Sequence, residues 1–147
     1  MPIFLDARTS QNASYSDSIS VQLTDTPQLV GQIGLIVTGA VSPIRVQLEW
    51  TLSLQSNVGI AAAVPAAPQQ AFPSVTIAIV RGTLSTDTLV YSVSYNAITQ
   101  VISDVASDYN VPVPNSGQLT YTMFVSTNTT GIFRVGPESF NGAAYSG

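Results

Sequence analysis

Two carboxylates, Asp104 and Asp108, are the residues whose type and spacing come closest to a reactive site in this chain. With Asn110 and Asn115 nearby, they could form a glycosidase-like acid pair or a weak calcium loop. The spacing D-x-x-x-D-x-N lacks the glycine and the terminal glutamate of the usual calcium loop. We therefore interpret this stretch as a surface turn.

The residue types that are missing exclude most other chemistry. The 147 residues include no cysteine, no histidine and no lysine, so zinc, copper, haem and iron–sulfur sites lack their usual ligands. Cysteine and lysine nucleophiles and histidine-dependent triads are excluded as well. We expect no catalytic residue, no metal and no cofactor, and we predict that the protein is not an enzyme.

The charge of the chain is low and acidic. Four arginines face eight acidic residues, which gives a net charge of −4, and this argues against nucleic-acid binding. Charged residues make up only 8% of the chain, against about 25% in an ordinary soluble domain. Uncharged hydroxyl and amide groups are buried at an interface at lower cost than charges. Either the domain simply has a neutral exterior, or much of its surface is covered by copies of itself.

Alternation of apolar and polar residues dominates the sequence. Residues 44–54 alternate without a break, which predicts a half-buried strand with Trp50 on its apolar face. A buried Trp50 argues against an exposed aromatic platform for sugars. Glu49 lies four residues after Arg45 on the polar face, and we predict a modest ion pair between them. Further strands are predicted at 18–24, 29–37, 75–80, 89–95, 119–125, 132–135 and 139–145, with a strand and turn at 97–106.

About eight short strands without a convincing helix predict an all-β fold. We expect an antiparallel two-sheet sandwich or jelly roll in a single domain, residues 18–147. The segment 59–73 is rich in alanine and proline, and we predict a long surface loop there.

The N-terminal segment, residues 1–17, has an apolar tip followed by a polar, linker-like stretch at 9–14. Ile3, Phe4 and Leu5 form that tip. The segment is either an arm that docks on a neighbouring subunit by adding a strand, or an edge strand of the chain's own sheet. The start of the sequence has no signal-peptide pattern, and no apolar run is long enough for a membrane helix, so we expect no membrane insertion.

Tyrosines recur at strand spacing along the second half of the chain. Such residues fill the edge of a core or a subunit interface more often than they bind sugars. We therefore predict interface aromatics at Tyr91, Tyr95, Tyr121 and Tyr145.

Short sequence phrases in residues 75–146 resemble a known family. They are Val-Arg-Gly at 80–82, Val-Tyr-Ser at 90–92, Tyr-Thr-Met-Phe-Val at 121–125, and Arg-Val-Gly-Pro at 134–137 with Phe-Asn-Gly-Ala-Ala-Tyr-Ser at 140–146. They are similar to the C-terminal head domains of collagen-like spore-surface (exosporium) proteins. That resemblance implies a trimeric jelly roll like those of tumour-necrosis-factor and C1q domains, with a collagen-like or spore-layer partner. A short arm before a jelly roll also resembles the pilin subunits of spore appendages.

The sequence thus leads to one main expectation and two alternatives. The main expectation is a structural, self-assembling homo-oligomer, a trimeric head or fibre subunit on the spore surface or otherwise extracellular, made without a signal peptide. The first alternative is a phage capsid or decoration protein. The second is a carbohydrate-binding module.

Overall fold

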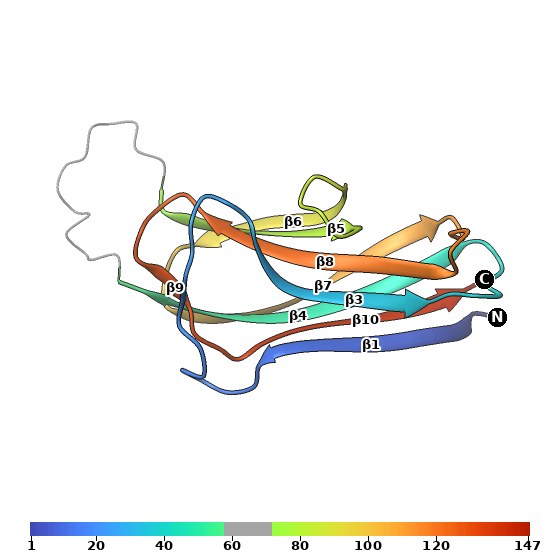
Figure 1. Cartoon of the computed structure of the whole chain (residues 1–147), viewed down its shortest axis with the longest axis horizontal. Helices are drawn as coiled ribbons and strands as arrows, with labels where there is room; N and C mark the ends of the chain where they lie inside the picture. Colours follow the sequence, from blue (N-terminus) through green and yellow to red (C-terminus); the bar gives the residue numbers. More distant parts are fainter. Residues whose placement is uncertain (58–71) are drawn as a thin grey trace.

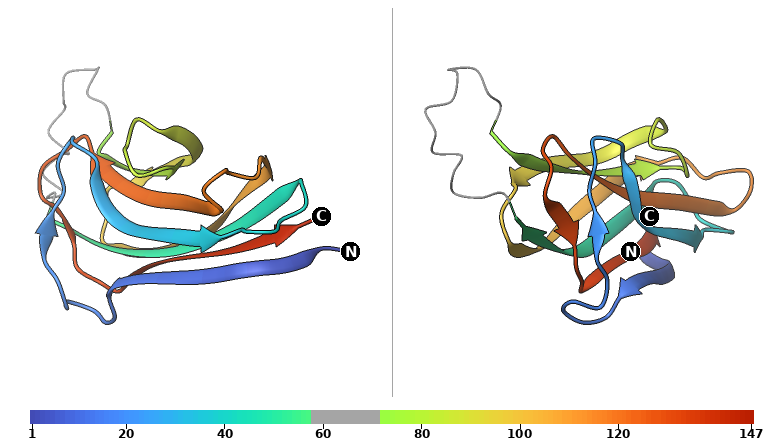
Figure 2. Two further views of the ribbon diagram at one scale, coloured as in Figure 1. Left: turned by 45° about the vertical axis from the view of Figure 1, so that its right-hand side comes forward. Right: turned by 60° about the vertical axis from the view of Figure 1, so that its left-hand side comes forward.

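The computed structural model describes residues 1–57 and 72–147, which form two antiparallel β-sheets stacked face to face (Figure 1 and Figure 2). We call the sheet that contains both ends of the chain the terminal sheet, and the other the middle sheet. The terminal sheet consists of β1 (Ile3–Ala13), β10 (Glu138–Ser146), β4 (Ile44–Ser56), β9 (Ile132–Arg134) and β2 (Val21–Gln22), with β7 (Gln100–Val111) along the other side of β4. The middle sheet has the order β3 (Gln28–Ile36), β8 (Gln118–Thr127), β5 (Ser74–Arg81) and β6 (Thr88–Asn96).

The connectivity is that of a jelly roll. β9 and β10 both pair with the same side of β4 and together fill one strand position. β1 pairs with β10 and β2 pairs with β9, so β1 and β2 together fill the next position. Counted in this way, the chain has eight strands in the orders first–eighth–third–sixth and second–seventh–fourth–fifth. Two such sheets joined by Greek-key connections define the jelly roll. The predicted all-β sandwich of jelly-roll type is confirmed.

The core lies between the sheets and follows the predicted alternation. Along β4, Ile44, Val46, Leu48, Trp50 and Leu52 are buried, whereas the residues between them point to the outer face. Alternate residues of β10 are buried in the same manner, because side chains on a strand point to opposite faces in turn. β8, in the interior of its sheet, is buried at most of its positions. Three of the largest fully buried side chains, Trp50, Tyr121 and Phe140, come from β4, β8 and β10.

Most predicted strands are present, with three differences. Only Val21 and Gln22 of the predicted strand 18–24 pair with another strand. The stretch 9–14 is not a linker, because β1 continues through it to Ala13. β7 continues to Val111, where a surface turn was expected. Most of the predicted loop at 59–73 lies outside the described residues.

Candidate functional site

The two candidate carboxylates lie on β7, so their interpretation as part of a surface turn is wrong. Asp104 and Asp108 are four residues apart on one strand and therefore share a face, the one turned toward the middle sheet. Each accepts hydrogen bonds from side chains of that sheet.

Asp108 is buried and binds two residues of the middle sheet. Arg81 on β5 donates from Nε and Nη2 to the two Asp108 oxygens at 2.8 Å each, a bidentate ion pair. The Tyr121 hydroxyl on β8 donates to Asp108 Oδ2 at 2.7 Å. The hydrogen bonds to Asp108 raise the pKa of the Arg81 guanidinium, and burial raises the pKa of the Tyr121 phenol.

Asp104 connects β7 to the edge strand β6. Tyr91 and Tyr95 donate hydrogen bonds to Asp104 Oδ2 at 3.2 and 3.1 Å, and the Val105 amide donates to Oδ1 at 2.8 Å. The bond from Val105, followed by those from Tyr95 and Tyr91, lowers the pKa of Asp104. Burial and the bond to Asp104 raise the pKa of Tyr95 to about 12.

These contacts assign a structural role to both acids. The carboxylates hold the β7 side of the sandwich closed by binding tyrosines and an arginine across the gap between the sheets. In residues 1–57 and 72–147, no group of three or more potential ligands gathers to hold a metal ion. The same residues contain no helix long and apolar enough to cross a membrane.

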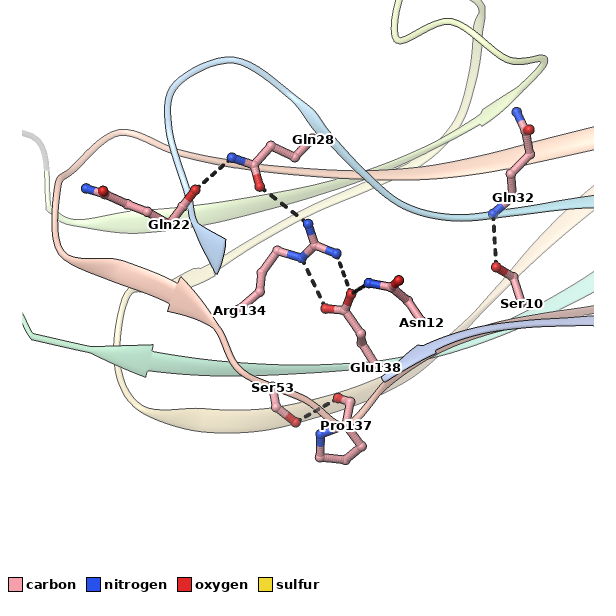
Figure 3. A network of polar contacts seen from close by, with 9 residues as sticks. All are labelled: Ser10, Asn12, Gln22, Gln28, Gln32, Ser53, Arg134, Pro137 and Glu138. Carbon is pink, nitrogen blue, oxygen red and sulfur yellow. Dashed lines mark hydrogen bonds and ion pairs between the residues drawn. The ribbon is translucent and has the colours of Figure 1, made fainter. Parts of the chain in front are cut away.

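A second polar network, centred on the buried Arg134 and Glu138, connects β1, β3, β9 and β10 at the end of the sandwich away from the chain termini (Figure 3). Arg134 on β9 and Glu138 on β10 form an ion pair in which Nε donates to Oε2 at 3.1 Å and Nη2 binds Oε1. Asn12 of β1 donates to the same carboxylate, and Arg134 donates to the Gln28 side chain on β3 at 3.4 Å. Gln28 in turn donates to the Gln22 carbonyl. Sequence reasoning missed this network; the pair forms because Arg134 ends β9 and Glu138 begins β10, so the two residues do not lie along one strand.

The predicted N-terminal tip is part of an edge strand in this structure. Ile3 and Phe4 are exposed on β1, whereas Leu5 packs against the core, and β1 pairs with β10 along most of its length. Asp6 accepts a hydrogen bond from the Ile36 amide at 2.8 Å, and Ser10 accepts one from the Gln32 amide at 3.4 Å. β1 therefore closes the side of the sandwich opposite to β7.

The four predicted interface tyrosines separate into two groups. Tyr121 is fully buried, so its assignment to an interface is wrong: it faces the core, where its hydroxyl binds Asp108. Tyr91 and Tyr95 are half-buried and point toward Asp104 rather than outward. Tyr145 lies on the outer face of the terminal sheet, where the Phe4 ring meets it edge-on with centroids 5.9 Å apart.

Several apolar and aromatic side chains are exposed on that outer face of the terminal sheet. Phe4 is 58% exposed, and Val101, Val105 and Tyr109 on β7 are 65%, 63% and 71% exposed. Sequence reasoning missed the β7 residues, although V-x-x-x-V-x-x-x-Y puts all three on one face of a strand. Between these groups lies a shallow hollow of about 250 Å³ with Ala7, Gln47, Asn141 and Ala143 among its lining residues.

The predicted ion pair between Arg45 and Glu49 on this face is wrong. Four residues along a strand span about 13 Å, which is too far for a salt bridge. The Arg45 guanidinium lies instead over the Tyr145 ring, 5.7 Å from its centroid. Arg45 thus makes a cation–π contact, and Glu49 is exposed on the outer face.

The outer face of the middle sheet has a different composition. Its four strands contain one charged residue, Arg81, whose side chain turns inward to Asp108. The outward positions are occupied by hydroxyl, amide, glycine and apolar residues. The scarcity of charge seen in the composition is therefore most pronounced on the outer face of the middle sheet, where no outward position of the four strands carries a charged side chain.

Comparisons with known proteins concern the fold. No family model matches the chain, and no curated protein matches it. Among solved structures, a chain of the T13 particle of infectious bursal disease virus matches with a TM-score of 0.46 and 11% identity, covering 99% of this chain and 35% of that one. Dimeric latent PorU from Porphyromonas gingivalis matches with a TM-score of 0.49 and 7% identity, covering 97% of this chain and 13% of that one. A cowpea mosaic virus top-component chain has a TM-score of 0.33 and 11% identity, with coverages of 97% and 84%. The chain thus spans about a third or less of the first two proteins.

Proposed function

We propose that the protein is a structural subunit that assembles with copies of itself through the outer face of the terminal sheet. The observation behind this proposal is the group of exposed aromatic and β-branched residues on that face, Phe4, Val101, Val105 and Tyr109, beside the half-buried Tyr145. Aromatic residues are enriched at subunit interfaces. Full burial of one such side chain contributes about 1.5–3 kcal/mol, so covering several of them would favour association.

The rest of the molecule agrees with a passive structural role. The buried acids bind arginines, tyrosines or an asparagine of the same chain, and the described residues bring no reactive set of side chains together. Side-chain hydrogen bonds connect the two sheets along both edges of the sandwich. Asp6 and Ser10 make them at the β1 edge, and Asp104 makes them at the β7 edge. A closed sandwich with exposed apolar side chains on one outer face is suited to repeated packing.

The biological setting is part of the proposal. Jelly rolls are the building blocks of many viral capsids, which supports a phage capsid or decoration protein as the first setting. The resemblance of residues 75–146 to spore-surface head domains supports the second, a trimeric head or fibre subunit on a spore, which would be an extracellular location. Negative-stain electron microscopy of the purified protein separates them, since closed shells support the first and discrete trimers or fibres the second.

Sedimentation velocity of the wild-type chain and of Val105→Lys tests the proposed interface. We expect an oligomer for the wild type and loss of that oligomer for Val105→Lys, because the lysine would place a charge inside the contact. Leu84→Lys is the matched control, since Leu84 is 62% exposed on the loop between β5 and β6, away from the terminal sheet. A wild-type monomer at about 100 µM, or identical oligomers for all three proteins, would contradict the proposal.

A further inference from the structure

The outer face of the middle sheet has properties that the proposed interface does not use. None of its outward residues on β3, β8, β5 and β6 is charged, whereas Arg45 and Glu49 lie on the opposite face of the molecule. Two copies can therefore bring this face together without like-charge repulsion or the desolvation of an ion.

Some of the polar groups of this face are already paired within the sheet. The hydroxyls of Thr76 and Ser94 bind each other at 3.0 Å across β5 and β6. Gln32 Nε2 donates to Thr122 Oγ1 at 2.9 Å across β3 and β8, and Thr122 Oγ1 donates to the Gly82 carbonyl at 2.7 Å. Because these groups keep their partners when water leaves, covering the face does not leave them unsatisfied.

The face also has enough area and apolar surface for a specific contact. Its strands contain 9, 10, 8 and 9 residues. At about 4.8 Å between strands and about 3.3 Å per residue, the face measures roughly 19 by 30 Å. Two copies would bury about 1,100 Å² in total, which reaches the roughly 1,000 Å² expected of a biological interface. Leu29, Ile36 and Leu89 are exposed on these same strands.

We propose that this face is a second self-association surface, which packs against the same face of another copy about a two-fold axis. It builds on the proposed function: the terminal sheet forms the first oligomer, and the middle sheet joins such oligomers into a larger assembly. A face that meets its own copy must be self-complementary, and a surface without charged side chains meets the electrostatic part of that requirement.

Charge placed at the centre of the face tests the inference. Ala78→Lys introduces a lysine on the outward side of β5, and Ser92→Lys introduces one at the exposed neighbouring position of β6, where folding is less at risk. Ser14→Lys, in the exposed turn after β1, is the matched control. Circular dichroism verifies that each variant folds, and sedimentation velocity from about 1 to about 100 µM gives the size distribution.

We expect the wild type and Ser14→Lys to form the larger assembly with rising concentration. The two face variants should stop at the smaller oligomer, with at least a tenfold weaker association constant for the larger species. A larger assembly unchanged by both variants, or a wild type that never exceeds the smaller oligomer, would overturn the inference and leave the proposed function standing. Assembly that responds to Ala78→Lys or Ser92→Lys but not to Val105→Lys would instead overturn the proposed function and support the second surface. A monomeric wild type would overturn both.

Discussion

Replacing Glu138 by glutamine should strongly destabilise the fold, because it leaves a buried arginine without its counter-charge. Glu138 is fully buried and Arg134 is 5% exposed, so water cannot solvate the guanidinium once the carboxylate is gone. The amide introduced by Glu138→Gln would also direct N–H groups toward the donors of Arg134 and Asn12, which now bind the carboxylate.

The expected size of the effect follows from burial. Removing one partner of a buried ion pair costs about 3–5 kcal/mol. That is a large fraction of the roughly 5–15 kcal/mol by which such domains are stable. At about 2–4 °C per kcal/mol for a chain of this length, the melting temperature should fall by about 6–20 °C.

Urea unfolding monitored by circular dichroism and by Trp50 fluorescence measures this change. Arg8→Ala is the control, because the Arg8–Asp6 pair is largely exposed and its loss should cost less than about 1 kcal/mol. The double variant Arg134→Met with Glu138→Leu should regain most of the lost stability, since no unpaired charge remains buried. A loss below about 1 kcal/mol for Glu138→Gln would refute the view that this buried pair is important for the stability of the fold.

Three further predictions concern the core and its pH dependence. Tyr121→Phe should cost about 1.5–3 kcal/mol in urea unfolding, because Asp108 loses a buried hydrogen-bond donor; a loss within error would show that the bond adds no stability. The pKa of Tyr95 is raised from 10.0 to about 12, so its contribution to the free energy of unfolding should be constant below pH about 10 and disappear as the pH rises toward 12. The urea midpoint of the wild type should therefore fall between those pH values, and it should fall less in Tyr95→Phe. An equal fall in Tyr95→Phe would assign the alkaline loss to other groups. Gly31→Ala should destabilise by about 1–3 kcal/mol, because its Cβ would lie 2.8 Å from Cβ of Phe140; an unchanged melting temperature would contradict this close approach of β3 and β10.

The sequence predicted best the strands with one buried and one exposed face. β4 has buried apolar residues at alternate positions, and that pattern is visible in the amino acids themselves. β1 could not be recognised in this way, because ten of its eleven residues are at least partly exposed and only Ala13 is buried. An edge strand held by backbone pairing and by Asp6 and Ser10 leaves no alternating pattern in the sequence.

The candidate site shows why single motifs misled. Asp104 and Asp108 occupy the inner face of β7 where apolar residues would be expected, so the strand looked like a polar turn. Their partners come from β5, β6 and β8, and only the folded chain shows that an arginine and three tyrosines converge on two acids. The scarcity of charge was visible from composition. That the outer face of the middle sheet lacks charged side chains could not be seen there, because it depends on which residues point outward.

Sedimentation velocity of the wild-type chain beside Val105→Lys is the most direct test of the self-assembly account. Loss of the wild-type oligomer when a lysine replaces this one exposed valine is the predicted result. A wild type that sediments as a single subunit at every concentration would contradict the account.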